Sequence, residues 1–378
     1  MKKVIALLIG LAVLSIVLAS CGGGGGGGGS TIPVAHVAFV TSTTYTANLG
    51  GIAGADAKCQ ARANAAGLPG TFKAWISDST TDAYCHIHNL TGKKAAKCGL
   101  ADLPVAAGPW NRTDGTPFAP TIDKLTASIV YTPLIYDEFG VSHPSFSNSF
   151  TNTDVSGVFQ VGYTACADWT DGISVASLAT GGIVQSTIRW AAGYASSCNA
   201  NLPLICLQTG AGPPLSPIAS TGKKAFVTST FFTGSLGGLT GADASCQARA
   251  TAGGLANASK FKAWLSDGST DAVTRLSSNG PWFRIDGIKV AGDKADLTDG
   301  TLFTAISQDE MGNYTLGPAW TGTNLNGTKT TNTCNSWTDG TGGFQGQIGL
   351  SDIAIQYWTN NTSTVCSSSF SLYCFEDQ

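Results

Sequence analysis

The stretch that decides the fold is Ala38–Asp82, AFVTSTTYTANLGGIAGADAKCQARANAAGLPGTFKAWISDSTTD. It is written a second time as Ala225–Asp271, AFVTSTFFTGSLGGLTGADASCQARATAGGLANASKFKAWLSDGSTD. In each copy a short apolar strand leads through Thr and Ser to a Gly-Gly turn and then a helix. The first helix is predicted over Gly54–Ala66, with Gly67 as the left-handed residue that ends it. The following strand, Phe72–Ile76, alternates and is expected to be half-buried.

The predicted helix has one stripe of small residues. Ala55, Cys59, Ala63 and Ala66 fall at i, i+4, i+8 and i+11, which predicts a single buried face. The stretch contains no nucleophile–base pair and no metal-binding cluster. We therefore interpret it as a packing unit.

The repeat continues beyond this stretch, which predicts a tandem duplication. First-copy motifs at 108–115, 137–138, 166–172 and 190 recur at 280–287, 309–310, 334–340 and 358. We predict a first domain over 36–208, a Pro/Gly/Ser-rich linker over 209–222 and a second domain over 223–378. The first copy alone carries an insert, Tyr84–Leu103.

The N-terminus has the pattern of a bacterial lipoprotein signal. Two lysines precede the apolar run Val4–Ala19, which is short for a membrane span. Leu18–Cys21 resembles a lipobox, so we expect residues 1–20 to be a signal peptide and Cys21 to be lipidated. An ordinary secretory signal is the alternative. Residues 21–35, with the run Gly22–Gly29, read as a flexible tether. The expected location is the outer membrane or cell surface, with the lipid as the membrane contact.

Composition narrows the function classes. Charged residues make up 12% and there are 48 glycines, which suits loop-rich exported modules. The formal net charge of −3 gives no electrostatic case for nucleic acid. Nucleotide-binding, nucleophile-elbow and zinc-protease signatures are missing from the sequence. We therefore expect a protein that is not an enzyme and that uses no cofactor and no metal.

The cysteines predict a disulfide framework. Eleven cysteines are present, and setting Cys21 aside leaves ten in an exported chain. Each copy has the same four, and these allow three connectivities per domain. We favour helix to last cysteine, with the middle two paired and the insert closed on itself: Cys59–Cys206, Cys166–Cys198, Cys246–Cys374, Cys334–Cys366 and Cys85–Cys98.

These features resemble a known fold family. The outer and inner cysteine pairs, the eight-residue gap between the last two cysteines and the terminal strand around Cys206 or Cys374 look like a C-type lectin-like domain. The opening unit resembles the endostatin domain of certain collagens. It is most similar to an uncharacterised family of bacterial surface lipoproteins with the G-A-D-x-x-C motif. The resemblance implies an α+β fold with two tandem, disulfide-stapled C-type lectin-like domains.

The sequence departs from the calcium-dependent members of that family. It has no Glu-Pro-Asn or Gln-Pro-Asp, and Gly193–Ser197 and Asn361–Val365 stand where Trp-Asn-Asp would precede the third cysteine. Calcium takes about six to eight oxygen ligands, several of them carboxylates. We therefore expect any binding to be calcium-independent and to use the loops over 108–190 or 280–358.

Aromatic and acidic residues in these loops are the candidate ligand contacts. Trp169 with Asp171, and Trp337 with Asp339, could stack on and hydrogen-bond a sugar. The alternative, which we favour, is a core tryptophan followed by a Thr-Asp-Gly turn. Tyr314 is the third aromatic candidate.

Three other clusters have a structural alternative that we favour. Cys85, His86, His88 and Cys98 could hold zinc, but a disulfide-closed surface loop with exposed histidines is preferred. The Asp-Glu pairs at 137–138 and 309–310 could be an acid/base pair, but local loop carboxylates are preferred. Arg112 with Asp114, and Arg284 with Asp286, are expected to pair locally.

The favoured function is a lipid-anchored surface adhesion or binding protein that recognises a protein or polysaccharide without calcium. A structural component of the envelope or extracellular matrix is the alternative. An enzyme on the related formylglycine-generating fold is a weaker third, because every cysteine already has a structural assignment.

Overall fold

The computed structural model describes residues 36–143, 148–212, 215, 220 and 222–378. The expected signal peptide, the lipidated Cys21 and the glycine tether lie outside the described residues. Within them the fold mixes helices and strands, as expected for its class. None of the helices in the described ranges is long and apolar enough to cross a membrane.

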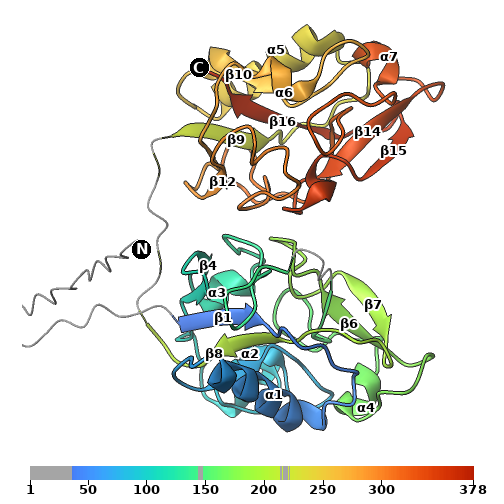
Figure 1. Ribbon diagram of the computed structural model, residues 1–378. Helices are drawn as coiled ribbons and strands as arrows, with labels where there is room; N and C mark the ends of the chain where they lie inside the picture. Colours follow the sequence, from blue (N-terminus) through green and yellow to red (C-terminus); the bar gives the residue numbers. More distant parts are fainter. Residues whose placement is uncertain (1–35, 144–147, 213–214, 216–219, 221) are drawn as a thin grey trace, which may run out of the picture. The chain divides into compact units, whose positions relative to one another are not determined.

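The first copy contains helices and strands in the order strand, helix, strand, with short elements after them (Figure 1). They are β1 (His36–Val40), α1 (Gly51–Ala65), β2 (Phe72–Ala74), α2 (Ala83–Ile87), the 3₁₀ helix η1 (Lys94–Gly99), β3 (Trp110–Arg112), β4 (Pro117–Ala119), α3 (Ile122–Leu125), β5 (Ser149–Phe150), α4 (Ala165–Trp169), β6 (Leu178–Gly182), β7 (Tyr194–Ser197) and β8 (Ile205–Gln208).

The second copy follows the same order of strands, with the added 3₁₀ helices η2 and η3 and without elements in the positions of η1 and α3. Its elements are β9 (Lys223–Val227), α5 (Gly238–Ala252), η2 (Ala258–Lys260), β10 (Phe261–Ala263), α6 (Ala272–Arg275), β11 (Trp282–Phe283), β12 (Lys289–Ala291), β13 (Pro318–Trp320), α7 (Cys334–Trp337), β14 (Gln345–Leu350), η3 (Gln356–Trp358), β15 (Thr362–Val365) and β16 (Ser371–Glu376).

The sheets of the two copies share one pattern. In the first copy the order is β2-β8-β1-β3-β4, and β1 pairs antiparallel with β8 and parallel with β3. In the second copy β9 pairs in the same way with β16 and β11, and β10 adds to the other edge of β16. The β13-β14-β15 ladder joins β16 directly, whereas its counterpart β5-β6-β7 forms a separate sheet.

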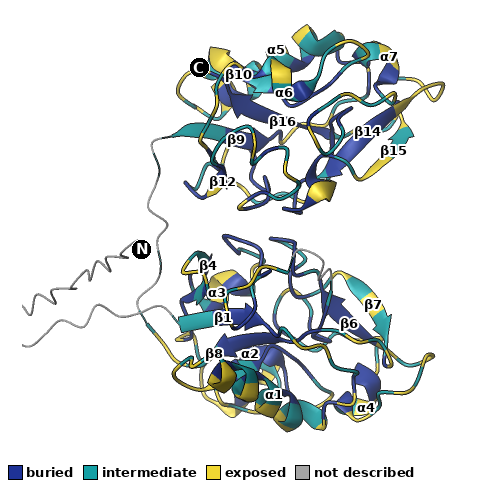
Figure 2. Ribbon diagram, in the orientation of Figure 1, coloured by how far each residue is buried: buried dark blue, intermediate teal, exposed yellow. Residues whose placement is uncertain are grey.

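The first and last strands of each copy lie in its core. Along β1, Phe39 packs in the cluster that includes α1, whereas Ala38 and Val40 pack in the cluster on the other face. This follows from the strand period of two. Figure 2 shows β8 and β16 as buried strands, and every residue of β16 is buried.

The G-A-D-x-x-C motif is explained by packing. A Cβ on Gly54 would lie 2.0 Å from the backbone oxygen of Leu49, so only glycine fits. Asp56 accepts a hydrogen bond from the backbone N–H of Ala74 at 3.0 Å, and Cys59 bonds to Cys206. The second copy repeats all three contacts. The motif therefore joins the helix to the sheet.

The helix begins earlier than the sequence predicts. It starts at Gly51 because Gly50 and Gly51, with φ of 83° and 73°, turn the chain directly into it. Gly67 has φ of 69°, as expected for the residue that ends a helix. The stripe is buried at Ala55, Cys59 and Ala63, but Ala66 lies past the last helical residue and is only half-buried.

The second strand is shorter and more buried than expected. The strands β2 and β10 each span three residues, and the alternation holds only there. Trp75 and Ile76, which the alternating pattern placed on opposite faces, are both fully buried. They follow the last residue of β2, and Trp75 packs in one core cluster while Ile76 packs in the other.

Five disulfides join the described cysteines in the pairs favoured from the sequence. They are Cys59–Cys206, Cys85–Cys98, Cys166–Cys198, Cys246–Cys374 and Cys334–Cys366. The long bridge of each copy ties α1 or α5 to the last strand. A loop of that length gives a stabilisation of roughly 4–5 kcal/mol on the chain-entropy account.

The elements α4 and α7 are left-handed turns. Cys166, Ala167 and Asp168 have φ between 51° and 53°, and Asn335 and Ser336 in the second copy have φ of 53° and 54°. Residues other than glycine disfavour this conformation. The turn places the following tryptophan so that its backbone oxygen accepts hydrogen bonds from the chain before α1 or α5. Both copies therefore keep the same strained turn for a packing reason.

Candidate binding site

The two tryptophans are core residues. Trp169 and Trp337 are fully buried. Their indole N–H groups donate to the backbone oxygens of Ser77 at 2.8 Å and Ser266 at 2.6 Å. A buried indole whose N–H is already paired offers no face to a ligand. The stacking hypothesis does not hold for either residue, and the core alternative does.

Asp171 and Asp339 cap their own turns. Asp171 accepts hydrogen bonds from the backbone N–H groups of Ile173 at 2.9 Å and Ser174 at 3.1 Å, and these lower its pKa. Asp339 accepts from the hydroxyl and the N–H of Thr341, both at 2.6 Å, which lowers its pKa too. Because the neighbouring indole rings are buried, they cannot stack on a sugar that these carboxylates would hydrogen-bond.

Tyr314 belongs to an internal pair. Its hydroxyl donates to Asp286 at 3.1 Å and accepts from Arg284 at 3.2 Å, and burial raises its pKa. Arg284 is fully buried and contacts Asp286 at 2.7 Å. The first copy has the same local pair between Arg112 and Asp114, at 2.6 Å. The expected pairing holds, and Tyr314 supports it rather than facing an open site.

The adjacent carboxylates have separate structural roles. Glu310 accepts from the hydroxyl of Ser229 at 2.5 Å and pairs with Arg249. Burial by itself would raise the pKa of Glu310, but the hydrogen bonds from Ser229 and Arg249 lower it below its ordinary value. Asp309 accepts two backbone N–H groups of its own loop. The first copy repeats this with Glu138 and Asp137, which favours the local alternative over an acid/base pair.

The histidines of the insert do not form a zinc site. Cys85 and Cys98 are joined, His86 Nε2 lies 2.8 Å from Asp56 Oδ1, and His88 Nδ1 contacts a backbone oxygen. The expectation of exposed histidines is wrong, because His86 is buried and His88 half-buried against the insert. Among the residues that the structure describes, no group of three or more His, Cys, Asp or Glu side chains could hold a metal ion.

An open hollow of about 640 Å³ lies among the loops of the second copy. Its lining is polar apart from one glycine and consists of Gly268, Asn324, Lys329, Thr330, Thr331, Asn332, Thr333 and Gln347. All but Gly268 fall within 280–358, the loop region that the sequence favours for recognition. We call this the 324–347 hollow.

Backbone hydrogen bonds fix the wall of the 324–347 hollow. Thr330 N–H donates to the backbone oxygen of Gly322 at 2.8 Å, and Gln347 N–H donates to that of Asn332 at 2.8 Å. Lys329 N–H donates to Asp271 Oδ1 at 2.8 Å. Two lining side chains also hold the loop: Asn324 Nδ2 donates to the backbone oxygen of Lys329 at 2.9 Å, and Thr330 Oγ1 accepts the N–H of Asn332 at 3.2 Å.

Several of these side chains keep unused hydrogen-bonding groups. The amide of Asn332 and the hydroxyls of Thr331 and Thr333 make no hydrogen bond to another described residue. Gln347 is buried, and its side-chain amide nitrogen donates to Asn360 Oδ1 at 2.9 Å. Its side-chain oxygen Oε1 is therefore free to accept a hydrogen bond. Donors and acceptors of this kind suit a hydroxyl-rich ligand.

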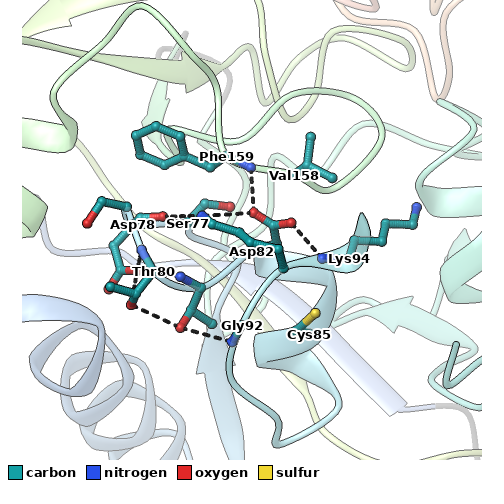
Figure 3. A network of polar contacts seen from close by, with 12 residues as sticks. Ser77, Asp78, Thr80, Asp82, Cys85, Gly92, Lys94, Val158 and Phe159 are labelled. Carbon is teal, nitrogen blue, oxygen red and sulfur yellow. Dashed lines mark hydrogen bonds and ion pairs between the residues drawn. The ribbon is translucent and has the colours of Figure 1, made fainter. Parts of the chain in front are cut away.

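The equivalent part of the first copy is tied more closely. Figure 3 shows the carboxylate of Asp82 between two backbone N–H groups, those of Phe159 at 3.0 Å and Lys94 at 2.7 Å. Lys94 belongs to the insert, so the insert reaches the carboxylate that corresponds to Asp271. Phe159 takes the place of Lys329, because its N–H makes the matching hydrogen bond.

Comparisons with known proteins give one result. A family model described as "Protein of unknown function (DUF1554)" matches residues 229–354. This segment holds α5, α7 and every residue that lines the 324–347 hollow. A search of curated proteins gives no match.

Reasoning from sequence missed the residues of the 324–347 hollow, although a signal for them exists. At two lining positions, Lys329 and Thr333, the second copy is polar where the first copy is apolar. Matching hydrogen bonds align Lys329 with Phe159 and Gln347 with Thr180, and counting back from the shared cysteine aligns Thr333 with Ala165. A position that becomes polar in one copy without a structural partner indicates a surface role.

Proposed function

We propose that this protein is an exported, lipid-anchored surface protein with two tandem C-type lectin-like domains that binds a polysaccharide without calcium. The repeated strand order, the disulfide from the first helix to the last strand and the inner disulfide support the domain assignment. The lipobox-like Leu18–Cys21 supports the anchor.

The observation that carries the binding function is the 324–347 hollow with its unused amide and hydroxyl groups. Saccharides present many hydroxyls, each a donor and an acceptor, and Asn, Gln and Thr side chains match them. Elsewhere in the candidate loops, the tryptophans, aspartates and Tyr314 are occupied by packing or turn contacts.

Binding of the purified chain to a glycan array, with and without a chelator, tests this function. Gln347→Ala and Asn332→Ala should each weaken binding by about tenfold, which corresponds to about 1.4 kcal/mol. Asn48→Ala, at an exposed position of the first copy outside the left-handed region, is the matched control and should bind normally. Binding that survives both hollow variants, or that a chelator abolishes, contradicts the proposal.

The anchor has its own test. Cys21→Ser should move the protein from the detergent phase to the aqueous phase in a detergent-partition assay, because the acylated residue is gone. Unchanged partition would exclude the lipid anchor while leaving the binding function untouched.

The two other functional classes have less support. The ten described cysteines are all disulfide-bonded, so none of them is a free thiol for a formylglycine-type reaction. A purely structural role would not require unpaired polar side chains around an open hollow. If neither the parent chain nor the Gln347→Ala variant binds any glycan, the structural class is favoured.

A further inference from the structure

The 324–347 hollow has one charged lining residue, Lys329. Its ammonium donates to the backbone oxygen of Ser269 at 3.2 Å. It forms no ion pair with any carboxylate in the described part of the chain. An exported protein of low charge content therefore places an ammonium without a carboxylate partner beside neutral amides and hydroxyls.

The acidic residues near Lys329 are already used by the backbone. Asp271 accepts the N–H of Lys329 itself, and Asp267 accepts the N–H groups of Ser269 and Thr270 at 2.8 Å and 2.7 Å. Both carboxylates thus stabilise the turn and the loop behind the hollow. The ammonium keeps donors for a further anionic group.

The first copy lacks this arrangement. Phe159 replaces Lys329, and the ammonium that packs over its ring at 4.8 Å is that of Lys93. Lys93 already has a carboxylate partner, Asp82, at 3.3 Å. The other lysine beside the first-copy loop, Lys94, is half-buried, and its ammonium donates to the backbone oxygen of Ser156 at 2.7 Å and packs over the Tyr84 ring. The exposed ammonium of Lys329 has neither a carboxylate partner nor such a ring contact in the described part of the chain.

We propose that the 324–347 hollow recognises an acidic saccharide, with Lys329 binding the carboxylate of a uronate unit. This rests on the proposed function, since it names the class of glycan that the same site takes. The carboxylate pairs with the ammonium in a charge-assisted contact, and the sugar hydroxyls hydrogen-bond Asn332, Thr333 and Gln347.

Binding of the full chain to polygalacturonate, to the same polymer after methyl esterification, and to dextran tests this inference. The acid form should bind at least about tenfold more tightly than the ester, and binding should weaken as salt is raised. Lys329→Gln should remove this preference, whereas Lys329→Arg should keep it. Lys124→Gln, at an exposed lysine of the first copy, is the charge-matched control and should leave binding unchanged.

The outcomes separate the inference from the proposed function. The acidic-saccharide inference is overturned if the acid and the ester bind equally, or if Lys329→Gln binds as the parent does. If Gln347→Ala loses binding in the same experiment, the proposed binding function still stands. If no polymer binds and no glycan on the array binds, both fail. Melting temperatures of the Lys329 and Lys124 variants should stay within about 1 °C of the parent, since exposed substitutions away from packing change stability little.

Discussion

Replacing Ala167 by glycine should stabilise the protein. Ala167 is exposed and has φ of 53° and ψ of 51°, in the middle of the left-handed turn α4. A left-handed residue with a Cβ costs about 1–2 kcal/mol, and glycine does not carry that cost. Glycine also gives the unfolded chain more conformational freedom, which lowers the free energy of unfolding by about 0.4–1 kcal/mol. The net gain in the free energy of unfolding should be about 0.5–1 kcal/mol.

The same substitution elsewhere supplies the control. Ala61 is an exposed residue of the right-handed helix α1, so Ala61→Gly should destabilise by about 1 kcal/mol. Neither change removes a buried contact, so the two differ only in backbone conformation. Asn335→Gly, at the equivalent turn of the second copy, should give a smaller gain than Ala167→Gly, because asparagine tolerates the left-handed region better than alanine.

Thermal and urea unfolding followed by circular dichroism measure these effects. For units of this size about 1 kcal/mol shifts the melting temperature by roughly 2–4 °C, so the two alanine variants should move in opposite directions. If Ala167→Gly destabilises as much as Ala61→Gly does, the turn is not strained, and the reasoning about α4 and α7 fails.

Three further results are expected. Gly54→Ala should destabilise by several kcal/mol because its Cβ would overlap the Leu49 oxygen, whereas Gly342→Ala, with open space around it, should be near neutral in thermal unfolding. Trp169→Ala should lower the free energy of unfolding by about 3–5 kcal/mol in urea titrations; an unchanged melting temperature would contradict its core position. The pKa of Glu310 is lowered on folding, so its stabilisation is present above about pH 4.5 and is lost as pH falls through the lower folded pKa. Glu310→Gln should flatten the loss of melting temperature between pH 5 and pH 3, and an unchanged profile would count against the shift.

The sequence predicts what depends on local pattern and on the repeat. The helix of each copy follows from its small-residue stripe and flanking glycines, and the disulfide pairs follow from matched cysteine positions. The left-handed turn does not follow, because Cys166–Trp169 contains no glycine to indicate positive φ. Its conformation is set by partners distant in sequence: the disulfide to Cys198 and the Ser77 oxygen that receives the indole N–H.

The residues of the candidate site divide in the same way, into those that a local pattern indicates and those that depend on packing between distant parts of the chain. The sequence indicates the loop region and the missing calcium ligands, and it favours a core position for the tryptophans, but it does not single out the residues that line the hollow. Trp337 and Asn332 are both plausible from composition, and only packing separates them, since the indole is enclosed and the amide has no partner. The hollow also needs Gln347, which meets Asn332 through a backbone hydrogen bond across fifteen positions of chain. No local pattern reports such a contact.

The divergence of the two copies explains why one of them keeps an open site. Asp82 and Asp271 hold the same loop, but Asp82 uses its second oxygen on Lys94 of the insert. The insert is present only in the first copy, where its own disulfide and buried Tyr84 fix it in place. In the second copy no insert competes for that region, and Lys329 stands where the first copy has Phe159. The insert and Phe159 thus tie this loop in the first copy, whereas in the second copy Lys329 and Asn332 line an open hollow.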